Sequence, residues 1–302
     1  MKFLVTGGAG FIGGNIVSRL LEDENEVVML DDLSLGRKVE HSKAVLSVGD
    51  TLDKSMVDAL CEGVDGVFHD AAKSSTPMFS PDPRNGIEVN LMGFINIAEA
   101  ARRNDFPVVY STTSSLYSRC PPPHSEDLPV SPGSFYEYSY YAREAVAKLY
   151  SDLYGLRLIG LRYFSVYGPG EDHKGKFANN ITQFLLALRQ GESPLVFGDG
   201  TQTRDFIYVG DVVEANMLAM KSNLKGEVIN VGTGIATSFN DVLAILKKQL
   251  KSDIRPTYVS NPIKNYVMHT KADTTKATQL LKFKAKISLE AGIMRVIQHL
   301  GI

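Results

Sequence analysis

The chain of 302 residues carries 32 lysine and arginine residues against 34 aspartate and glutamate residues, so its charge is nearly balanced. This balance excludes the broad basic surface by which nucleic-acid-binding proteins attract phosphates. The sequence contains no run of about 18 apolar residues, which is the length needed to cross a bilayer. The two cysteines, Cys61 and Cys120, have no metal-binding spacing. We therefore expect a soluble, cytoplasmic protein with no signal peptide, no membrane or nucleic-acid partner and no metal.

A glycine-rich segment at residues 6–13 follows a short apolar run and precedes a helical pattern, which predicts strand, turn and helix. At this spacing Gly7 permits a tight turn, Gly10 lets a diphosphate approach the backbone, and Gly13 lets the helix pack closely on the strand. The start of the helix offers free N–H groups to phosphates. A second apolar run ends at Asp31, whose carboxylate can accept hydrogen bonds from an adenosine ribose. The segment predicts a dinucleotide site.

Strands and helices alternate through the first half of the chain. Apolar runs predict strands at residues 3–5, 26–31, 44–48, 66–69, 106–110 and 158–163, and helical spacing predicts helices at residues 15–21, 53–60, 87–103 and 136–154. The alternation predicts an α/β fold, a Rossmann-type doubly wound parallel sheet with helices on both faces. Ligands bind such sheets beyond the carboxyl ends of the strands. The predicted strand ends carry Thr6, Asp31, Asp50, residues 69–73, residues 111–115 and Ser165.

After residue 165 the pattern changes to short elements separated by glycines, with a charged, glycine-rich loop at residues 168–176. Helices are predicted at residues 241–250 and 293–300. This part suits a smaller mixed α/β domain that covers the cofactor and forms a pocket with the first. We expect a dinucleotide-binding domain over residues 1–165 and an interleaved substrate-binding domain over residues 166–302.

Several further segments complete a resemblance to the extended short-chain dehydrogenase/reductases that act on nucleotide-sugars. They are residues 49–50, 69–72, Asn90 with Gly93, 111–117, 161–169, 197–209 and 230–234. The resemblance covers nearly the whole chain. It implies an NAD-dependent epimerase, which inverts a sugar carbon by moving a hydride to the nicotinamide and back to the other face of the sugar.

Two branches of the family share features with this chain. The glycine segment and the pair Asn179–Asn180 resemble UDP-galactose 4-epimerase, and this branch implies interconversion of UDP-glucose and UDP-galactose. Residues 73–76, 173–175 and 237–239 resemble the ADP-glyceromanno-heptose 6-epimerases, so 6-epimerisation of an ADP-heptose stays open. Ser114–Ser115 stand where 4,6-dehydratases carry an acid pair, which disfavours elimination.

The resemblance implies that Tyr136 is the base for the hydroxyl proton and that Thr113 is its hydroxyl partner, because oxidising an alcohol requires both functions. The family places a lysine four residues after this tyrosine. This chain has Tyr140 there, and it contains no Tyr-x-x-x-Lys sequence. The lysine's charge lowers the pKa of the tyrosine, and an unperturbed tyrosine with a pKa of about 10 is a poor base at neutral pH.

Three explanations for the missing lysine are open. The positive nicotinamide suffices by itself, with slower turnover; or another cation reaches in; or the protein binds a nucleotide-sugar without converting it. The candidate cations are Arg143, seven residues after Tyr136 and on the same helical face, and Lys174, which matches a lysine proposed as a second base in the heptose epimerases. By default, we expect both to be solvated surface charges.

Asp31 favours NAD over NADP because its carboxylate repels a 2′-phosphate, and Asp32 adds to that repulsion. Arg37 and Lys38 act in the opposite sense, since they could pair with that phosphate. NAD is the expected cofactor. The resemblance implies cofactor contacts from Gly7, Gly10, Phe11, Ile12, Gly13, Asp31, Asp32, Asp50, Thr51, Ala71, Ala72, Lys73, Asn90, Ser111, Tyr136, Tyr163, Phe164 and Val166.

Arg204 is the expected ligand of the substrate's diphosphate, because a guanidinium pairs well with phosphate oxygens. An ion pair with the neighbouring Asp205 is the alternative. The expected substrate contacts are Ser74, Ser75, Thr113, Ser165, Asn180, Phe197 and Arg204. In the family, helices like those at residues 87–103 and 136–154 pair across a two-fold axis, so a homodimer is expected.

Overall fold

The structure is a computed structural model that describes residues 1–35, 43–80, 82–253, 255–261 and 266–302. Arg37 and Lys38, which bear on the choice between NAD and NADP, lie outside the described residues. Within the described part, no helix is both long enough and apolar enough to cross a membrane.

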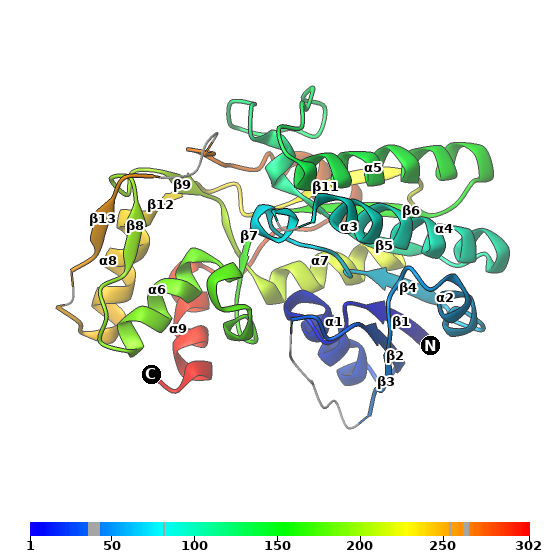
Figure 1. The fold of residues 1–302 in the computed structure, drawn as a ribbon, viewed down its shortest axis with the longest axis horizontal. Helices are drawn as coiled ribbons and strands as arrows, with labels where there is room; N and C mark the ends of the chain where they lie inside the picture. Colours follow the sequence, from blue (N-terminus) through cyan, green and yellow to red (C-terminus); the bar gives the residue numbers. More distant parts are fainter. Residues whose placement is uncertain (36–42, 81, 254, 262–265) are drawn as a thin grey trace.

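Seven parallel strands form the main sheet (Figure 1). Their spatial order is β11 (Glu227–Val231), β6 (Leu158–Tyr163), β5 (Val108–Thr113), β4 (Gly66–His69), β1 (Lys2–Thr6), β2 (Glu26–Asp31) and β3 (Val45–Val48). The order reverses between β1 and β4, both of which pair with neighbours in parallel register. The predicted doubly wound sheet is confirmed.

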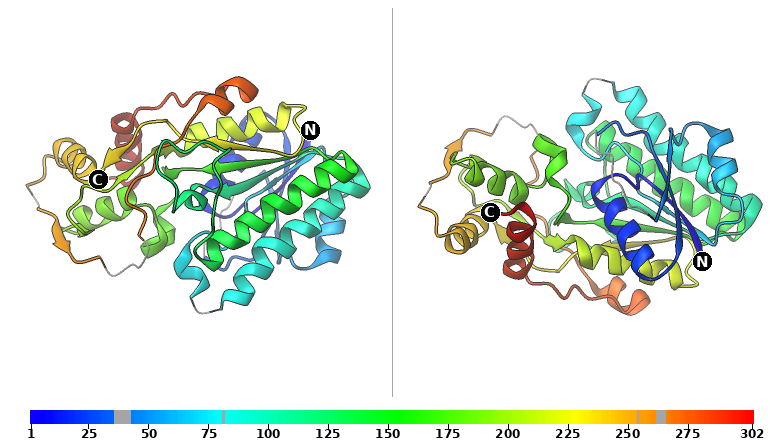
Figure 2. Two further views of the ribbon diagram at one scale, coloured as in Figure 1. Left: turned by 90° about the horizontal axis from the view of Figure 1, so that it is seen from above. Right: turned by 90° about the horizontal axis from the view of Figure 1, so that it is seen from below.

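Helices cover both faces of the sheet (Figures 1 and 2). One face packs on α1 (Phe11–Glu22) and α7 (Val209–Lys221), and the other on α2 (Lys54–Leu60), α4 (Gly93–Asn104) and α5 (Phe135–Tyr154). Because both faces are covered, β4, β5 and β6 are buried along their whole length, and each begins with apolar residues in the sequence.

Several helices begin directly after a capping residue, and this explains why their first residues differ from the predicted ones. The helix predicted at residues 241–250 is α8 (Phe239–Leu250), because Ser238 before the helix and Asp241 in its first turn form a capping box. The helix predicted at residues 293–300 is α9 (Leu289–Leu300), which begins after the capping residue Ser288. The segment at residues 87–103 is divided into α3 (Pro83–Ile87), a π-helical turn (Glu88–Met92) and α4.

The second half of the chain builds a separate core and also returns to the main sheet. Helices α6 (Asn180–Arg189), α8 and α9 gather at one end of the molecule (Figure 1) around residues such as Phe184, Phe239 and Ile293. Short strands pair as β7 (Ser165–Tyr167) with β10 (Phe206–Tyr208), β8 (Leu195–Phe197) with β13 (Thr257–Val259), and β9 (Thr203–Arg204) with β12 (Thr237–Ser238). Because β11 and α7 belong with the main sheet, the two domains expected at a boundary of residue 165 stay a prediction.

The glycine turn between β1 and α1 brings two backbone segments into contact. Gly7 has a φ of +70°, and a Cβ at Gly13 would lie 2.1 Å from the carbonyl oxygen of Gly7. A side chain at Gly13 would therefore push the helix away from the strand. The neighbouring Gly14 differs, because its Cβ would meet the nearest atom at 3.5 Å, an ordinary contact.

We expect Gly13→Ala to lower the free energy of unfolding by about 1–3 kcal/mol, the usual result of overpacking, and to weaken cofactor binding. The matched control is Gly14→Ala on the same helix, which we expect to stabilise the protein by about 0.5–1 kcal/mol. Chemical denaturation and cofactor titration measure both effects. Equal stability of the two variants would contradict the close packing of this turn.

Candidate active site

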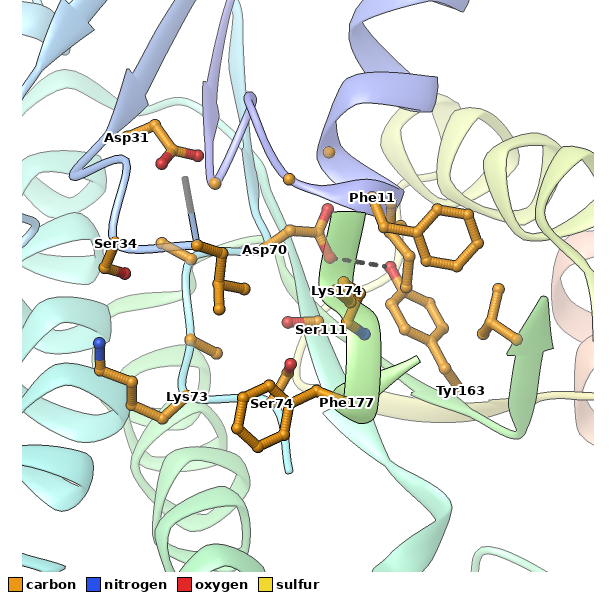
Figure 3. Close-up of a pocket in the computed structure, with 18 of the residues that line it drawn as sticks. Phe11, Asp31, Ser34, Asp70, Lys73, Ser74, Ser111, Tyr163, Lys174 and Phe177 are labelled. Carbon is orange, nitrogen blue, oxygen red and sulfur yellow. Dashed lines mark hydrogen bonds between the residues drawn. The ribbon is translucent and has the colours of Figure 1, made fainter. Parts of the chain in front are cut away.

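A cavity of about 360 Å³ opens at the carboxyl ends of the parallel strands, between the sheet and the 3₁₀ helix Asp172–Phe177 (Figure 3). It is lined by all of the predicted cofactor residues except Asn90, by all of the predicted catalytic residues, and by three of the predicted substrate residues. These lining residues are Gly7, Gly10, Phe11, Ile12, Gly13, Asp31, Asp32, Asp50, Thr51, Ala71, Ala72, Lys73, Ser111, Tyr163, Phe164, Val166, Thr113, Tyr136, Tyr140, Lys174, Ser74 and Ser165.

The end of the cavity at β2 suits an adenosine ribose. The carboxylate of Asp31 accepts hydrogen bonds from the backbone N–H groups of Ala9 and Leu33, at 3.0 and 2.9 Å. Burial raises the pKa of this carboxyl, and the two N–H groups oppose that rise. Asp31 ends β2 and Thr113 ends β5, so β1 and β4 lie between them, a separation of about 14 Å across the sheet. An elongated ligand across the strand ends fits this cavity, with its diphosphate at the glycine turn.

Tyr136 and Thr113 meet at the other end of the cavity. Thr113 is the last residue of β5, and Tyr136 lies in the first turn of α5, which begins after the capping residue Ser134. The phenol donates a hydrogen bond of 2.9 Å to the Thr113 Oγ1, and both side chains are buried. Burial raises the pKa of Tyr136, while hydrogen bonds with Thr113 and Ser115 lower it. The two predicted partners therefore lie within reach of one reacting hydroxyl.

The default expectation that Arg143 is a solvated charge is wrong, because this residue is fully buried under the cavity. Its Nε donates to the carbonyl of Asn90 at 2.8 Å, and its Nη1 donates to the carbonyl of Ser111 at 3.0 Å. These carbonyls replace water around the guanidinium. The guanidinium carbon also lies 4.9 Å from the centre of the Tyr140 ring. A cation at this distance is attracted to the face of an aromatic ring.

Lys174 also departs from the default expectation of a surface charge. Its side chain is 17 % exposed, its Nζ lies 4.0 Å from Glu171 Oε1, and it is 5.9 Å from the centre of the Phe11 ring. Figure 3 shows it reaching over the cavity from the covering 3₁₀ helix. The ammonium therefore faces the ligand space close to the start of α1.

Asn90 does not line the cavity but holds a residue that does. Its Oδ1 accepts from the backbone N–H of Lys73 at 2.7 Å, and its amide donates to the Lys73 carbonyl at 3.2 Å. The same amide donates to Ser139 Oγ at 3.0 Å. Asn90 thereby ties the loop after β4 to α5, and a direct contact with the cofactor stays a prediction.

Four predicted substrate residues, Ser75, Asn180, Phe197 and Arg204, lie outside the lining of the cavity. Arg204 donates to the carbonyls of Thr203 and Met268 and lies over the ring of Tyr266 at 5.2 Å. The alternative ion pair with Asp205 is wrong, because that carboxylate accepts hydrogen bonds from the N–H groups of Thr233, Gly234 and Ala272. The substrate roles of the four residues stay predictions.

Asp70 is a cavity residue to which the sequence analysis assigned no role. It follows β4 directly and receives a hydrogen bond of 3.4 Å from the Tyr163 hydroxyl, the dashed line in Figure 3. Burial raises its pKa from 3.8 to about 7, although the guanidinium of Arg143 opposes the rise. Its position at a strand end was the available signal. Phe177, Asn179 and the pair Ser114–Ser115 also line the cavity.

Within the described ranges, no group of three or more His, Cys, Asp or Glu side chains could hold a metal ion. Cys61 and Cys120 are both free thiols.

Comparison with known proteins places this cavity in context. Residues 3–232 match the NAD dependent epimerase/dehydratase family. A putative UDP-glucose 4-epimerase from Methanocaldococcus jannaschii is 38 % identical over 299 residues, which span 97 % of this chain and 96 % of that protein. The structure of UDP-glucose 4-epimerase from Thermotoga maritima with UDP-glucose is 31 % identical, with a TM-score of 0.91 over 100 % of this chain and 99 % of that one. UDP-glucuronic acid 4-epimerase from Bacillus cereus, solved with UDP-glucuronic acid and NAD, is 27 % identical, with a TM-score of 0.88 over 100 % and 99 % of the two chains.

We expect Asp70→Asn to remove a pH-dependent loss of stability. Between about pH 4 and pH 7 the folded protein keeps a proton on Asp70 that the unfolded chain has released. The free energy of unfolding therefore falls as the pH rises through this window. The variant, which can still accept from Tyr163, should gain stability relative to the native protein as the pH increases, as measured by denaturation at several pH values.

The control for this measurement is Asp127→Asn, which removes a carboxylate from an exposed position. A constant difference between Asp70→Asn and the native protein from pH 4 to pH 8 would contradict the protonated, buried state of Asp70.

Proposed function

We propose that this chain, which belongs to the NAD dependent epimerase/dehydratase family, interconverts UDP-glucose and UDP-galactose by inverting carbon 4 of the hexose. NAD is the cofactor. Bound NAD supplies the chemistry of accepting a hydride from the sugar carbon and giving it back. Every other step in the proposal falls to side chains of this chain.

The observation that carries the proposal is the hydrogen bond of 2.9 Å between Tyr136 and Thr113 at the cavity wall. In its ionised form the phenol takes the proton of the sugar hydroxyl as hydride leaves the same carbon, and it returns that proton afterwards. Thr113 accepts from the phenol while it is neutral, which positions it, and the single hydroxyl proton of Thr113 is then available to the sugar oxygen. Since both side chains are buried in the cavity wall, few positions beside the phenol are open to water.

A neutral hexose suits the wall around this pair. Hydroxyl side chains of Ser111, Ser114 and Ser115 line the cavity there and can bond sugar hydroxyls without adding charge. The ammonium groups among the described lining residues belong to Lys73 and Lys174. Lys174 already lies near the carboxylate of Glu171, which reduces its attraction for a sugar carboxylate. A UDP-hexose is therefore favoured over a UDP-hexuronate.

Two alternatives remain as outcomes of the test. The first is 6-epimerisation of an ADP-heptose, for which Lys174 in the cavity wall would serve as a second base. The second is a protein that binds nucleotide-sugar without converting it, because Tyr140 supplies no charge where the family has lysine. Mass spectrometry of the purified protein identifies any retained cofactor and nucleotide-sugar and separates UDP from ADP ligands.

We expect the native protein to convert UDP-glucose to UDP-galactose faster than it converts UDP-glucuronate or an ADP-heptose. Tyr136→Phe should lower kcat by about 10²–10⁴-fold, the usual contribution of a general base. The matched control is Tyr138→Phe, because Tyr138 lies on the same helix but is 57 % exposed. Chromatography of the nucleotide-sugars measures all rates. Preferred turnover of another sugar would overturn the substrate, and full activity of Tyr136→Phe would overturn the role of the phenol.

We also propose that the chain is a homodimer that pairs through α5. Phe135, Tyr138, Leu149 and Leu153 form an exposed apolar stripe along this helix, and Leu153 alone is 70 % exposed. Contiguous exposed apolar surface of this kind is typical of a subunit interface. A cytoplasmic location remains a prediction of the sequence alone.

Light scattering should give twice the mass of one chain for the native protein, and the mass of one chain for the double variant Leu149→Glu with Leu153→Glu, because two buried charges would oppose association. Leu195→Glu is the control, since Leu195 is 52 % exposed on β8, a different element. A native protein with the mass of one chain would refute the dimer.

A further inference from the structure

The proposed chemistry needs a positive charge near Tyr136, and Tyr140 does not supply it. Tyr140 is buried and meets the Tyr136 ring edge-on, with ring centres 5.2 Å apart. A phenol at this position can donate a hydrogen bond but carries no charge at neutral pH. A buried phenol without a nearby cation is a weak base, because burial disfavours its ionised form.

Arg143 brings a full charge to the back of the same ring. Its side chain is completely buried, and its guanidinium carbon lies 4.9 Å from the centre of the Tyr140 ring. Two of its nitrogens bond the carbonyls of Asn90 and Ser111. The third, Nη2, is buried without a hydrogen-bond partner. An arginine stays protonated even when buried, so this cation is permanent.

A buried, incompletely bonded guanidinium is costly for a fold, because each unpaired charged donor forfeits its hydration. Among the described residues, no carboxylate forms a short ion pair with Arg143 that would offset this loss. The carboxyl that interacts with it is that of Asp70, whose pKa is raised by burial to about 7, so this partner is partly protonated near neutral pH. A buried cation that destabilises the fold in this way is best explained by its electrostatic effect on the side chains of the cavity wall.

The titratable groups that face this cluster come from several elements. Asp70 and His69 come from β4 and the loop after it, Tyr110 from β5, Tyr163 from β6, and Glu137 from α5. Glu137 accepts hydrogen bonds from Gly133 N and Ser118 Oγ, and its charge raises the pKa of Tyr136, against the effect of Arg143. Asp70 interacts with the guanidinium favourably, so Glu137 is the acidic group of this set that acts against Arg143 at Tyr136.

We propose that Arg143 is a positioning residue that replaces the family's lysine electrostatically: Tyr140 occupies the place of the lysine side chain, and the guanidinium behind it provides the charge that favours the ionised form of Tyr136. The inference rests on the proposed function, because it assigns the charge that this reaction needs. It explains how a family member without the lysine keeps a usable base.

The first test reads the ionisation of Tyr136 without turnover. Difluorotyrosine is placed at position 136, and its fluorine resonance is followed against pH in the purified protein. Arg143→Met, which keeps volume and removes charge, should move the titration about one pH unit higher, since a nearby opposite charge shifts a pKa by about 1–3 units. Arg143→Lys should titrate close to the native protein. Arg102→Met is the control, because Arg102 lies over the Tyr154 ring on the molecular surface.

The second test reads the same effect in turnover. Arg143→Met should lower kcat about tenfold at neutral pH with little change in KM, and its rate should recover as the pH rises. Adding Tyr140→Lys to that variant should restore the neutral rate, because a charge returns at the family's position. In the native background, Tyr140→Lys adds a second charge beside Arg143, so we expect a smaller gain in rate than the same change gives in the Arg143→Met variant.

The outcomes separate the inference from the proposed function. An unchanged fluorine titration in Arg143→Met, or a rate loss that is equal at every pH, overturns the inference and leaves Arg143 a structural residue. A tenfold gain from Tyr140→Lys in the native background overturns it also, and this variant decides the matter if Arg143→Met does not fold. A shifted titration in a protein that converts none of the sugars supports Arg143 and overturns the proposed reaction.

Discussion

The close contact between Gly13 and the backbone of Gly7 is the constraint on which the rest of the site depends. It brings the start of α1 directly over the end of β1, so the N–H groups of the helix face the cavity. All seven strands of the main sheet are parallel, and their carboxyl ends therefore meet at one edge. The turn, Asp31 and Thr113 come from different strands, but this shared edge makes them walls of one cavity.

Burial at this edge changes the chemistry of each polar group there. A phenol, a carboxyl and a guanidinium lie within one buried cluster, where electrostatic interactions are stronger than in water. Tyr136 and Asp70 both have raised pKa values because burial disfavours their charged forms, and Arg143 opposes both shifts. One cation thus acts on two acids of different roles. The apolar residues of α4 and α5 that cover this face exclude the water that would otherwise screen it.

The sequence predicted well what depends on local pattern. The strands of the first half and the glycine turn follow from apolar runs and glycine spacing, and both are confirmed. Burial of Arg143 was missed because α5 is aromatic on several faces, so helical spacing did not show which face meets the sheet. The surroundings of Arg204 were missed because they depend on Tyr266, a residue distant in sequence. The addition of β11 to the main sheet likewise depends on a non-local parallel pairing.

The loss of the family's lysine is therefore a question about charge and not about hydrogen bonding. A lysine at position 140 would deliver both from one side chain. In this chain Tyr140 can form a hydrogen bond and Arg143 is charged, and the guanidinium carbon lies 4.9 Å from the centre of the Tyr140 ring. The carbonyls of Asn90 and Ser111 fix the guanidinium, and Asn90 also holds the loop that carries Lys73. A change at Arg143 would consequently reach the cavity by two routes, through the charge felt by Tyr136 and through the loop after β4. Only the first of these routes depends on pH, and that is the physical distinction between an electrostatic and a structural role for this residue.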